Sequence, residues 1–337
     1  MSLYEDMFGL VGQLGAQLRE GHAAGEAALG AARAAPPASA TISALGGSAI
    51  GGSLAEALWR DALRAPTVVN RSATLPGWIA PGHLVVAISY SGATAETLSA
   101  ARAAIARGAD VIAVTAGEQL GEIVRAAGGR VVRVQGGLPP RAALGSLFGA
   151  LAAVLEHAAV TPATGADIRA AAHACDAVAS DRGGSLASEL GEALASTTTW
   201  VYGHGPLSAV ARRFKSQLNE NAKSVAAFGE LPEADHNEIV GWAGTARTGG
   251  RHAAIHLADP DDPPTIRATI ATTPRLIDDD ATLHRVLTGQ GQTRTARAFW
   301  LLSLLDHASV YTARAAGADP YEIERIVELK QALAAAT

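Results

Sequence analysis

Short apolar runs alternate with helical patterns along the first half of the chain. The runs that predict strands cover residues 41–45, 67–70, 84–88, 111–115 and 130–134. The patterns that predict helices cover residues 3–34, 46–59, 94–107 and 141–157. Strands that alternate with helices are typical of a parallel sheet covered by helices on both faces. The sequence therefore predicts an α/β fold with mostly parallel sheets.

The second half repeats this order. A strand at 198–202, the turn Gly203-His204-Gly205-Pro206 and a helix at 207–221 follow one another as in residues 41–59. A strand at 252–257 and helices at 293–315 and 320–334 complete this half. A chain of 337 residues exceeds what one hydrophobic core usually organises. We therefore predict two similar domains, residues 1–160 and 161–337, divided at the Pro- and Gly-containing stretch 161–165.

Composition and charge exclude several classes of protein. A net charge of -5, with acidic and basic residues interspersed, gives no cationic surface for nucleic acid. The most apolar stretch, residues 142–155, is too short for a membrane span and predicts a buried helix. Glu5 and Asp6 stand where a signal peptide would carry positive charge, and the single Cys175 forms no intrachain disulfide. We expect a cytoplasmic protein without membrane or nucleic-acid partners.

The segment Ser89–Thr97 (SYSGATAET) follows an apolar strand and precedes a helix. Ser89, Ser91 and Thr94 supply hydroxyl donors there, and Gly92 lets the backbone come close to a ligand. The free amides and positive dipole of the next helix favour an anion. We predict a phosphate site. The alternative is a turn whose hydroxyls only satisfy the helix start, and Glu96 fits a phosphate only if it points away.

Two other strand-end loops sharpen this interpretation. Residues 46–52 (GGSAIGG) lack the spacing of a dinucleotide fingerprint, and no acidic residue ends a following strand, so NAD is disfavoured. The loop after residues 252–257 contains Asp259, Asp261 and Asp262, which would repel a phosphate. We therefore predict one phosphate site, in the first domain.

Ionisable side chains concentrate in residues 219–223 and 230–238 of the second half. Glu220 falls near the end of a predicted helix, and His236 falls in the polar loop that follows. A carboxylate and an imidazole in one cleft suit proton transfer between adjacent carbons. A solvated helix carboxylate and a loop histidine are the alternatives. We interpret Lys223 as a surface charge and His204 as structural.

These motifs together resemble the bifunctional phosphoglucose/phosphomannose isomerases along nearly the whole chain. The matching segments are GGSAIGG (46–52), SYSGATAET (89–97), LPPR (138–141), NENAK (219–223), ELPEADHNEI (230–239) and residues 319–330. The SYSGATAET segment alone marks a sugar-isomerase (SIS) domain, while the HNEI segment and Lys330 make the resemblance specific. The chain departs from the family pattern at Ser53 and Asp235, where Asp and Asn are common.

The resemblance implies an aldose-ketose isomerase with two SIS domains, each a mostly parallel sheet flanked by helices. Its implied reaction interconverts fructose 6-phosphate with glucose 6-phosphate and mannose 6-phosphate through a cis-enediol, without cofactor or metal. The implied phosphate-binding residues are Ser48, Ser89, Ser91 and Thr94, with Gly47 in the substrate-binding loop.

The resemblance also implies the catalytic roles. Glu220 moves the proton between C1 and C2, and Arg141 lies against the developing enediolate. His236 and Lys330 assist ring opening. The resembling enzymes are homodimers, so we expect His236 to reach the Glu220 of a partner chain.

Two other functions stay open on the sequence alone. SIS domains also bind sugar phosphates without catalysis in regulators, although this sequence leaves no helix-turn-helix segment to transmit such sensing. The chain is alternatively an isomerase of another phosphosugar, such as an amino sugar.

Overall fold

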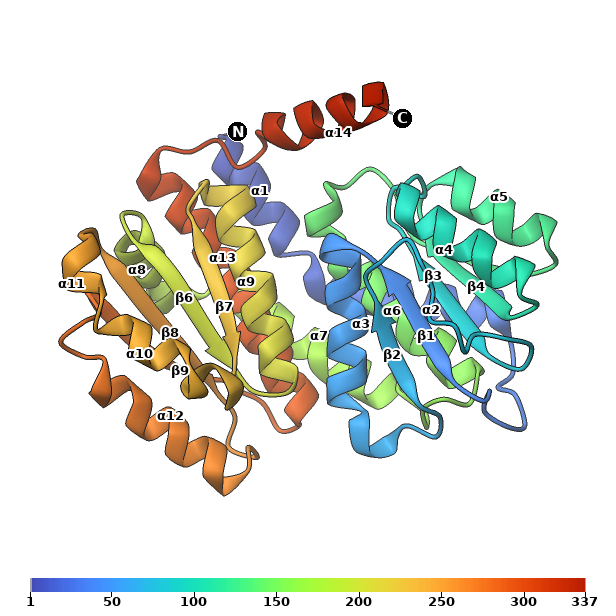
Figure 1. Cartoon of the computed structure of the whole chain (residues 1–337), viewed down its shortest axis with the longest axis horizontal. Coiled ribbons are helices and arrows are strands. Elements are labelled where there is room, and N and C mark those ends of the chain that lie inside the picture. Colours follow the sequence, from blue (N-terminus) through green and yellow to red (C-terminus); the bar gives the residue numbers. More distant parts are fainter. Residues whose placement is uncertain (1, 337) are drawn as a thin grey trace.

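The chain forms two α/β units, each a parallel sheet with helices on its faces (Figure 1). The computed structural model describes residues 2–336. The first sheet has the strand order β2-β1-β3-β4-β5, and the second has the order β7-β6-β8-β9. The strands are β1 (Ala40–Ala44), β2 (Thr67–Asn70), β3 (Leu84–Ile88), β4 (Asp110–Thr115), β5 (Arg130–Arg133), β6 (Thr198–Gly203), β7 (Ala226–Glu230), β8 (His252–Ala258) and β9 (Leu283–Thr288). The predicted fold class is confirmed.

β1 and β3 lie in the middle of the first sheet, and every residue of both strands is buried. Their sequences are apolar nearly throughout because helices cover both faces of the sheet. The two strands are parallel neighbours, with Ala44 opposite Ile88 at their ends. The loops that follow β1 and β3 therefore begin side by side at the C-terminal edge of this sheet.

The second sheet repeats the strand arrangement of the first. Strands β7, β6, β8 and β9 follow the same order as β2, β1, β3 and β4, and all neighbours pair in parallel. The predicted internal duplication is thus confirmed in the topology. The sequence patterns missed β7 and β9, which contain small, polar or charged residues (AAFGE and LHRVLT) where a buried strand would be apolar.

Fourteen α-helices and three short 3₁₀ turns are found between residues 2 and 336. The helices are α1 (Leu3–Val11), α2 (Leu14–Leu29), α3 (Gly46–Leu58), α4 (Ala95–Ala106), α5 (Glu118–Ala126), α6 (Leu144–His157), α7 (Gly165–Ala179), α8 (Gly184–Leu194), α9 (Pro206–Ala222), α10 (Glu238–Trp242), α11 (Thr245–Thr248), α12 (Pro264–Leu276), α13 (Arg294–Ala316) and α14 (Glu324–Ala336). The 3₁₀ turns are η1 (Arg60–Ala62), η2 (Pro140–Ala142) and η3 (Glu233–His236).

Three helices differ from their predicted bounds. The single helix predicted at residues 3–34 is two helices, α1 and α2, separated at Gly12 and Gln13. The helix predicted from Arg141 begins at Leu144, because Arg141 belongs to η2. The last helix begins at Glu324 and not at Pro320. Figure 1 shows α14 projecting from the body of the molecule, and all its described residues are exposed.

The two units share one hydrophobic core. It runs from the strands of the first sheet through α6, α9 and α13 to the strands of the second. At its centre the rings of Phe148 and Phe299, one from each unit, lie 4.8 Å apart. This continuous packing fixes the two units relative to each other.

The apolar stretch 142–155 forms most of α6, which is almost entirely buried, as predicted. Within the described residues, we find no helix with the length and hydropathy needed to cross a bilayer. The predicted domain boundary at 161–165 falls between α6 and α7, and we propose it as the division between the two units.

Candidate active site

The C-terminal edge of the first sheet carries two of the predicted loops. Helix α3 begins directly after β1, so Ser48 lies in its first turn. Gly46 has φ +52°, a left-handed conformation that favours glycine at this turn. The Ser89–Thr94 loop follows β3 at the neighbouring position. The structure therefore brings Ser48 and the predicted phosphate loop to one edge, where helix N-termini are exposed to ligands.

Hydroxyl groups within the Ser89–Thr94 loop contact one another. Ser89 is only 2% exposed, and its Oγ lies 2.9 Å from Thr94 Oγ1 and 3.5 Å from Ser91 Oγ. The Oγ atoms of Ser89 and Ser91 accept the amides of Gly92 and Ala93. Thr94 is the N-cap residue of α4, but its side chain makes no capping hydrogen bond. Helix capping therefore does not account for Thr94, whose hydroxyl is hydrogen-bonded to Ser89 within the loop.

Gly92 and Glu96 decide whether an anion can approach this loop. Gly92 has φ +69°, and a Cβ there would lie 2.8 Å from the backbone carbon of Gly117. No other residue fits that position without a shift of the backbone. Glu96, in the first turn of α4, is exposed. Ser91 is exposed as well, so exposure alone does not fix the direction of the Glu96 side chain, and the condition that it points away from a phosphate stays a prediction.

Residues 138–141, which include Arg141, pack against the loop after β3 and the first turn of α3. The hydroxyl of Tyr90, a nearly buried residue of the phosphate loop, accepts a hydrogen bond from Leu138 N at 2.9 Å. A Cβ on Gly47 would lie 3.9 Å from Arg141 Cα. Sequence reasoning missed Tyr90, although it stands between Ser89 and Ser91. Its hydroxyl ties the loop to the turn that bears the arginine.

The Arg141 guanidinium is buried between the two units and all three of its nitrogens face a polar group. Nε donates to Asn221 Oδ1 at 2.8 Å, and Nη2 donates to the carbonyl oxygen of Pro320. Nη1 lies 3.7 Å from Oε2 of Glu220. Burial lowers the pKa of Arg141, and the Glu220 carboxylate opposes that shift. The arginine of the first unit and the predicted base of the second thus meet at one site.

Glu220 lies near the C-terminal end of α9, and about a third of its side chain is exposed. Lys223 ends this helix in a left-handed conformation. Its ammonium donates to the carbonyl oxygens of Glu220, at 2.8 Å, and of Asp319. Burial lowers the pKa of Lys223. Lys223 is exposed, in agreement with the predicted surface charge, and it also joins the end of α9 to the segment before α14.

His236 does not lie beside Glu220 within one chain. Helix α9 connects two parallel strands, so its C-terminal end, with Glu220, is at the N-terminal edge of the second sheet. His236 follows β7, at the opposite edge, and the five residues of β7 span roughly 16 Å. His236 is exposed. The idea of one intrachain cleft for both residues is therefore not supported by the fold.

Three remaining sequence features have clear positions. Lys330 lies on α14 and is exposed. Ser53 accepts a hydrogen bond from Arg71, and Asp235 accepts one from Thr273 at 2.7 Å. The two departures from the family pattern thus make local contacts outside the Arg141 and Glu220 pair.

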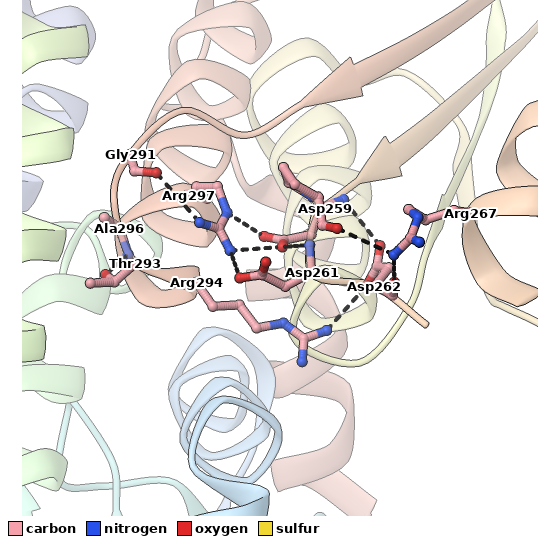
Figure 2. Close-up of polar contacts among 10 residues, drawn as sticks. Asp259, Asp261, Asp262, Arg267, Gly291, Thr293, Arg294, Ala296 and Arg297 are labelled. Atoms are coloured by element: carbon pink, nitrogen blue, oxygen red, sulfur yellow. Dashed lines mark hydrogen bonds and ion pairs between the residues drawn. The ribbon is translucent and has the colours of Figure 1, made fainter. Parts of the chain in front are cut away.

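The corresponding edge of the second sheet is occupied by ion pairs (Figure 2). Asp259 is buried and accepts from Nε and Nη2 of Arg297, both at 2.9 Å. Asp262 accepts from Arg294 at 3.0 Å, and Asp261 also pairs with Arg297. Both arginines lie in the first turn of α13. Sequence reasoning missed their pairing with these carboxylates. In the second unit, carboxylates paired with arginines thus follow β8, at the position where the Ser89–Thr94 loop follows β3 in the first.

Comparison with known proteins adds independent information. Residues 184–333 match the family model of the bacterial phospho-glucose isomerase C-terminal SIS domain, and residues 73–128 match the SIS domain. A bifunctional phosphoglucose/phosphomannose isomerase of Caldicellulosiruptor bescii is 35% identical over 87% of this chain and 88% of its own length. The protein of the same name from Aquifex aeolicus is 31% identical over 86% and 88%.

Other similarities are partial or concern the fold. A D-glucosamine-6-phosphate 4-epimerase of Sulfolobus acidocaldarius is 34% identical over 46% of this chain and 49% of its own length. Among solved structures, the C-terminal domain of glucosamine-fructose-6-phosphate aminotransferase from Francisella tularensis has a TM-score of 0.71 at 15% identity. That match covers 95% of this chain and 98% of the other, and supports the two-unit fold.

Proposed function

The chain belongs to the family of bifunctional phosphoglucose/phosphomannose isomerases, and from this membership we propose the reaction and the residues that perform it. The protein is a sugar-phosphate isomerase. Its reaction interconverts fructose 6-phosphate with glucose 6-phosphate and with mannose 6-phosphate. Both aldoses form from the same ketose because each differs from it only by transfer of hydrogen between C1 and C2.

The observation that carries the mechanism is the 3.7 Å separation of Arg141 Nη1 and Glu220 Oε2, close to Gly47 in the first turn of α3. Glu220 removes a proton from one carbon and returns it to the other through a cis-enediol. Arg141 offsets the negative charge on the enediolate oxygen without giving up a proton itself. One carboxylate serves both steps, because both carbons of a planar enediol present a face to it.

The phosphate is held by the first unit. Hydroxyls of Ser48, Ser89, Ser91 and Thr94 donate to its oxygens, and Gly47 lets the backbone of α3 come close. The N-terminal ends of α3 and α4 add favourable partial charge. This arrangement needs no lysine, and it leaves C1 and C2 of the sugar free to reach the second unit.

We assign ring opening to His236 and Lys330, and we propose that His236 acts in a partner chain of a homodimer. Its position at the opposite edge of the second sheet from Glu220 supports this assignment. A twofold dimer then holds two equivalent sites, each with Glu220 from one chain and His236 from the other. The single, buried Cys175 is compatible with work in the cytoplasm.

Mixing two inactive variants tests the shared site. Glu220→Gln and His236→Ala are denatured together and refolded, so that about half of the dimers are mixed. Each mixed dimer has one site with both defects and one with neither, and roughly a quarter of wild-type activity returns. If both residues act within one chain, every site keeps a defect and the mixture stays inactive.

A coupled assay across hexose and pentose phosphates tests the reaction itself. We expect turnover of fructose, glucose and mannose 6-phosphates. The partial similarity to an epimerase of glucosamine 6-phosphate favours including that amino sugar as the second candidate substrate. Turnover of glucosamine 6-phosphate alone would overturn the proposed substrate, and binding of all these sugars without turnover would identify a sensor.

A further inference from the structure

The orientation of the Arg141 guanidinium depends on a residue to which no role has yet been given. Arg141 is only 6% exposed, so its contacts are made away from solvent. Nε donates to the side-chain oxygen of Asn221 at 2.8 Å. This contact crosses between the units, because Arg141 lies in η2 of the first unit and Asn221 lies in α9 of the second. Asn221 is also the residue directly after Glu220.

The amide of Asn221 is itself held in one orientation. Its Nδ2 donates to Ser309 Oγ at 2.9 Å, and Ser309 Oγ donates to the carbonyl oxygen of Asp306 at 2.6 Å. A carbonyl oxygen only accepts, so the serine proton points to Asp306 and its lone pair faces Asn221. At the other end, Arg141 Nε only donates. Both neighbours therefore require the same orientation of the amide, with its oxygen toward the arginine.

A second buried contact holds the backbone of the same arginine. Arg213 Nη2 donates to the carbonyl oxygen of Arg141 at 3.0 Å. Arg213 is fixed in turn by the carboxylate of Asp306, with Nε and Nη2 at 2.9 and 2.5 Å. Asp306 and Arg213 are at most 4% exposed. Asp306 thus supports Arg141 by two routes, through Arg213 to its backbone and through Ser309 and Asn221 to its side chain.

We infer that Asn221 is a positioning residue for the isomerase reaction, which turns the guanidinium of Arg141 so that Nη1 faces Glu220. With Nε held by Asn221 and Nη2 by Pro320, Nη1 is the nitrogen left for the enediolate oxygen. An arginine that loses the Nε contact can rotate about its last bonds and place this charge elsewhere. This inference rests on the proposed role of Arg141.

The test compares two Asn→Ala substitutions on one helix. Asn221→Ala removes the acceptor of Arg141 Nε, and we expect kcat to fall about 10- to 100-fold with KM changed less than about threefold. Affinity for the enediolate mimic 5-phosphoarabinonate falls in parallel with kcat. The control is Asn219→Ala, two residues earlier, whose side chain donates to Ser224 O at 2.7 Å, whereas Arg141 donates to Asn221 and Pro320. We expect its kcat to stay within about twofold of the wild type.

A double-mutant cycle shows whether Asn221 acts through Arg141. In an Arg141→Lys background there is no Nε for Asn221 to hold, so Asn221→Ala has no further effect on kcat. The inference is overturned if the double variant loses kcat by the product of the two single-variant factors. It is also overturned if Asn219→Ala and Asn221→Ala lower kcat equally. If Asn221→Ala does not fold, Ser309→Ala replaces it, since it frees the amide but keeps the acceptor. That variant must lower kcat at least threefold at unchanged KM, or the inference fails.

Failure of the proposed function has a different signature. If Arg141→Ala leaves kcat unchanged, the role of Arg141 itself is wrong. If Arg141→Ala and Arg141→Lys lower kcat while Asn221→Ala does not, the arginine keeps its role and only the positioning by Asn221 is wrong.

Discussion

The C-terminal edges of the two sheets have the same topology and opposite contents. At the first edge, the turn after β3 presents Ser89, Ser91 and Thr94, which are uncharged and contact one another. At the second, the turn after β8 presents Asp259 and Asp262, which are paired with arginines of α13 (Figure 2). The first edge can accept an anion. At the second edge, carboxylates of the chain already occupy the arginines.

This difference shows how a duplicated fold divides its tasks. A parallel sheet offers a ligand site at the C-terminal ends of its strands, but the side chains there decide whether it is used. The second unit instead contributes the C-terminal end of α9, where Glu220 lies 3.7 Å from Arg141 of the first unit. The proposed phosphate-binding residues and the proposed base thus lie in different units and at different ends of their sheets.

The largest expected effect is the loss of kcat on replacing Glu220 of the second unit. Glu220→Gln removes the proposed base, so kcat falls about 100- to 10,000-fold while sugar-phosphate binding persists. Steady-state kinetics and titration with 5-phosphoarabinonate measure both quantities. The control is Glu96→Gln, which neutralises an exposed carboxylate of the first unit and leaves kcat within about twofold. Near-normal turnover by Glu220→Gln contradicts the assignment.

The second edge should matter for stability and not for catalysis. Asp259→Ala leaves the buried Arg297 with the exposed Asp261 as its carboxylate partner, so the free energy of unfolding falls by about 3 kcal/mol. Asp261→Ala removes that exposed partner and costs less than about 1 kcal/mol. Urea denaturation measures both. If Asp259→Ala lowers kcat of the folded protein without lowering its stability, the second edge takes part in catalysis, contrary to this prediction.

The first edge should show the reverse behaviour. Replacing Ser89 and Thr94 together by Ala removes two donors to a charged phosphate, so affinity for phosphorylated ligands falls about 10- to 100-fold. The control pair is Ser72 and Thr74, whose hydroxyls lie 3.0 Å apart in the loop after β2, and we expect their replacement to leave affinity unchanged. Calorimetric titration with 5-phosphoarabinonate compares the pairs. Equal affinities would place the phosphate elsewhere.

Acid should weaken the second sheet before the first. Burial, with a smaller contribution from His284, lowers the pKa of His256 in β8 to about 3, below its unfolded value of about 6.5. The unfolded state binds more protons between these values, so stability is complete above pH 6.5 and falls toward pH 3. From pH 7 to 5 the loss is about 2 kcal/mol.

Hydrogen exchange, followed strand by strand, measures this difference. Strands β1 to β5 contain no histidine, so the first sheet serves as an internal reference. We expect the protection factors of β6 and β8, which are corrected for the slower intrinsic exchange in acid, to fall below pH 6.5 more than those of β1 and β3. A His256→Phe variant loses this acid dependence. An equal fall of the protection factors in both sheets, or an unchanged pH dependence in the variant, would contradict the role of His256.

Local signals located most of the fold and singled out the loop proposed to bind phosphate. Strands β1 and β3 are continuous apolar runs, and the serine and threonine motif directly follows β3, so neighbouring residues carry the information. The strands β7 and β9 were missed because their polar and small residues break that pattern. The resemblance to a family supplied Arg141, which no local pattern distinguishes from other arginines.

The contacts that hold the site together lie beyond such local reasoning. Tyr90 binds Leu138 across 48 residues, and Arg213 binds Asp306 across 93. Partners so far apart in sequence depend on how the helices pack, which no short motif encodes. Asn221 had one usable signal, its place beside Glu220 in the NENAK segment.

The most direct test of the account follows hydrogen during one turnover. Fructose 6-phosphate is converted in D2O, and the glucose 6-phosphate formed is examined for deuterium at C2 by NMR. A carboxylate base that carries the proton through an enediol exchanges it with solvent, so we predict deuterium at C2 with the wild type and loss of the reaction with Glu220→Gln. Two results together would contradict proton transfer by Glu220. The wild-type product would carry at C2 only the hydrogen that left C1, and the Glu220→Gln variant would still be active.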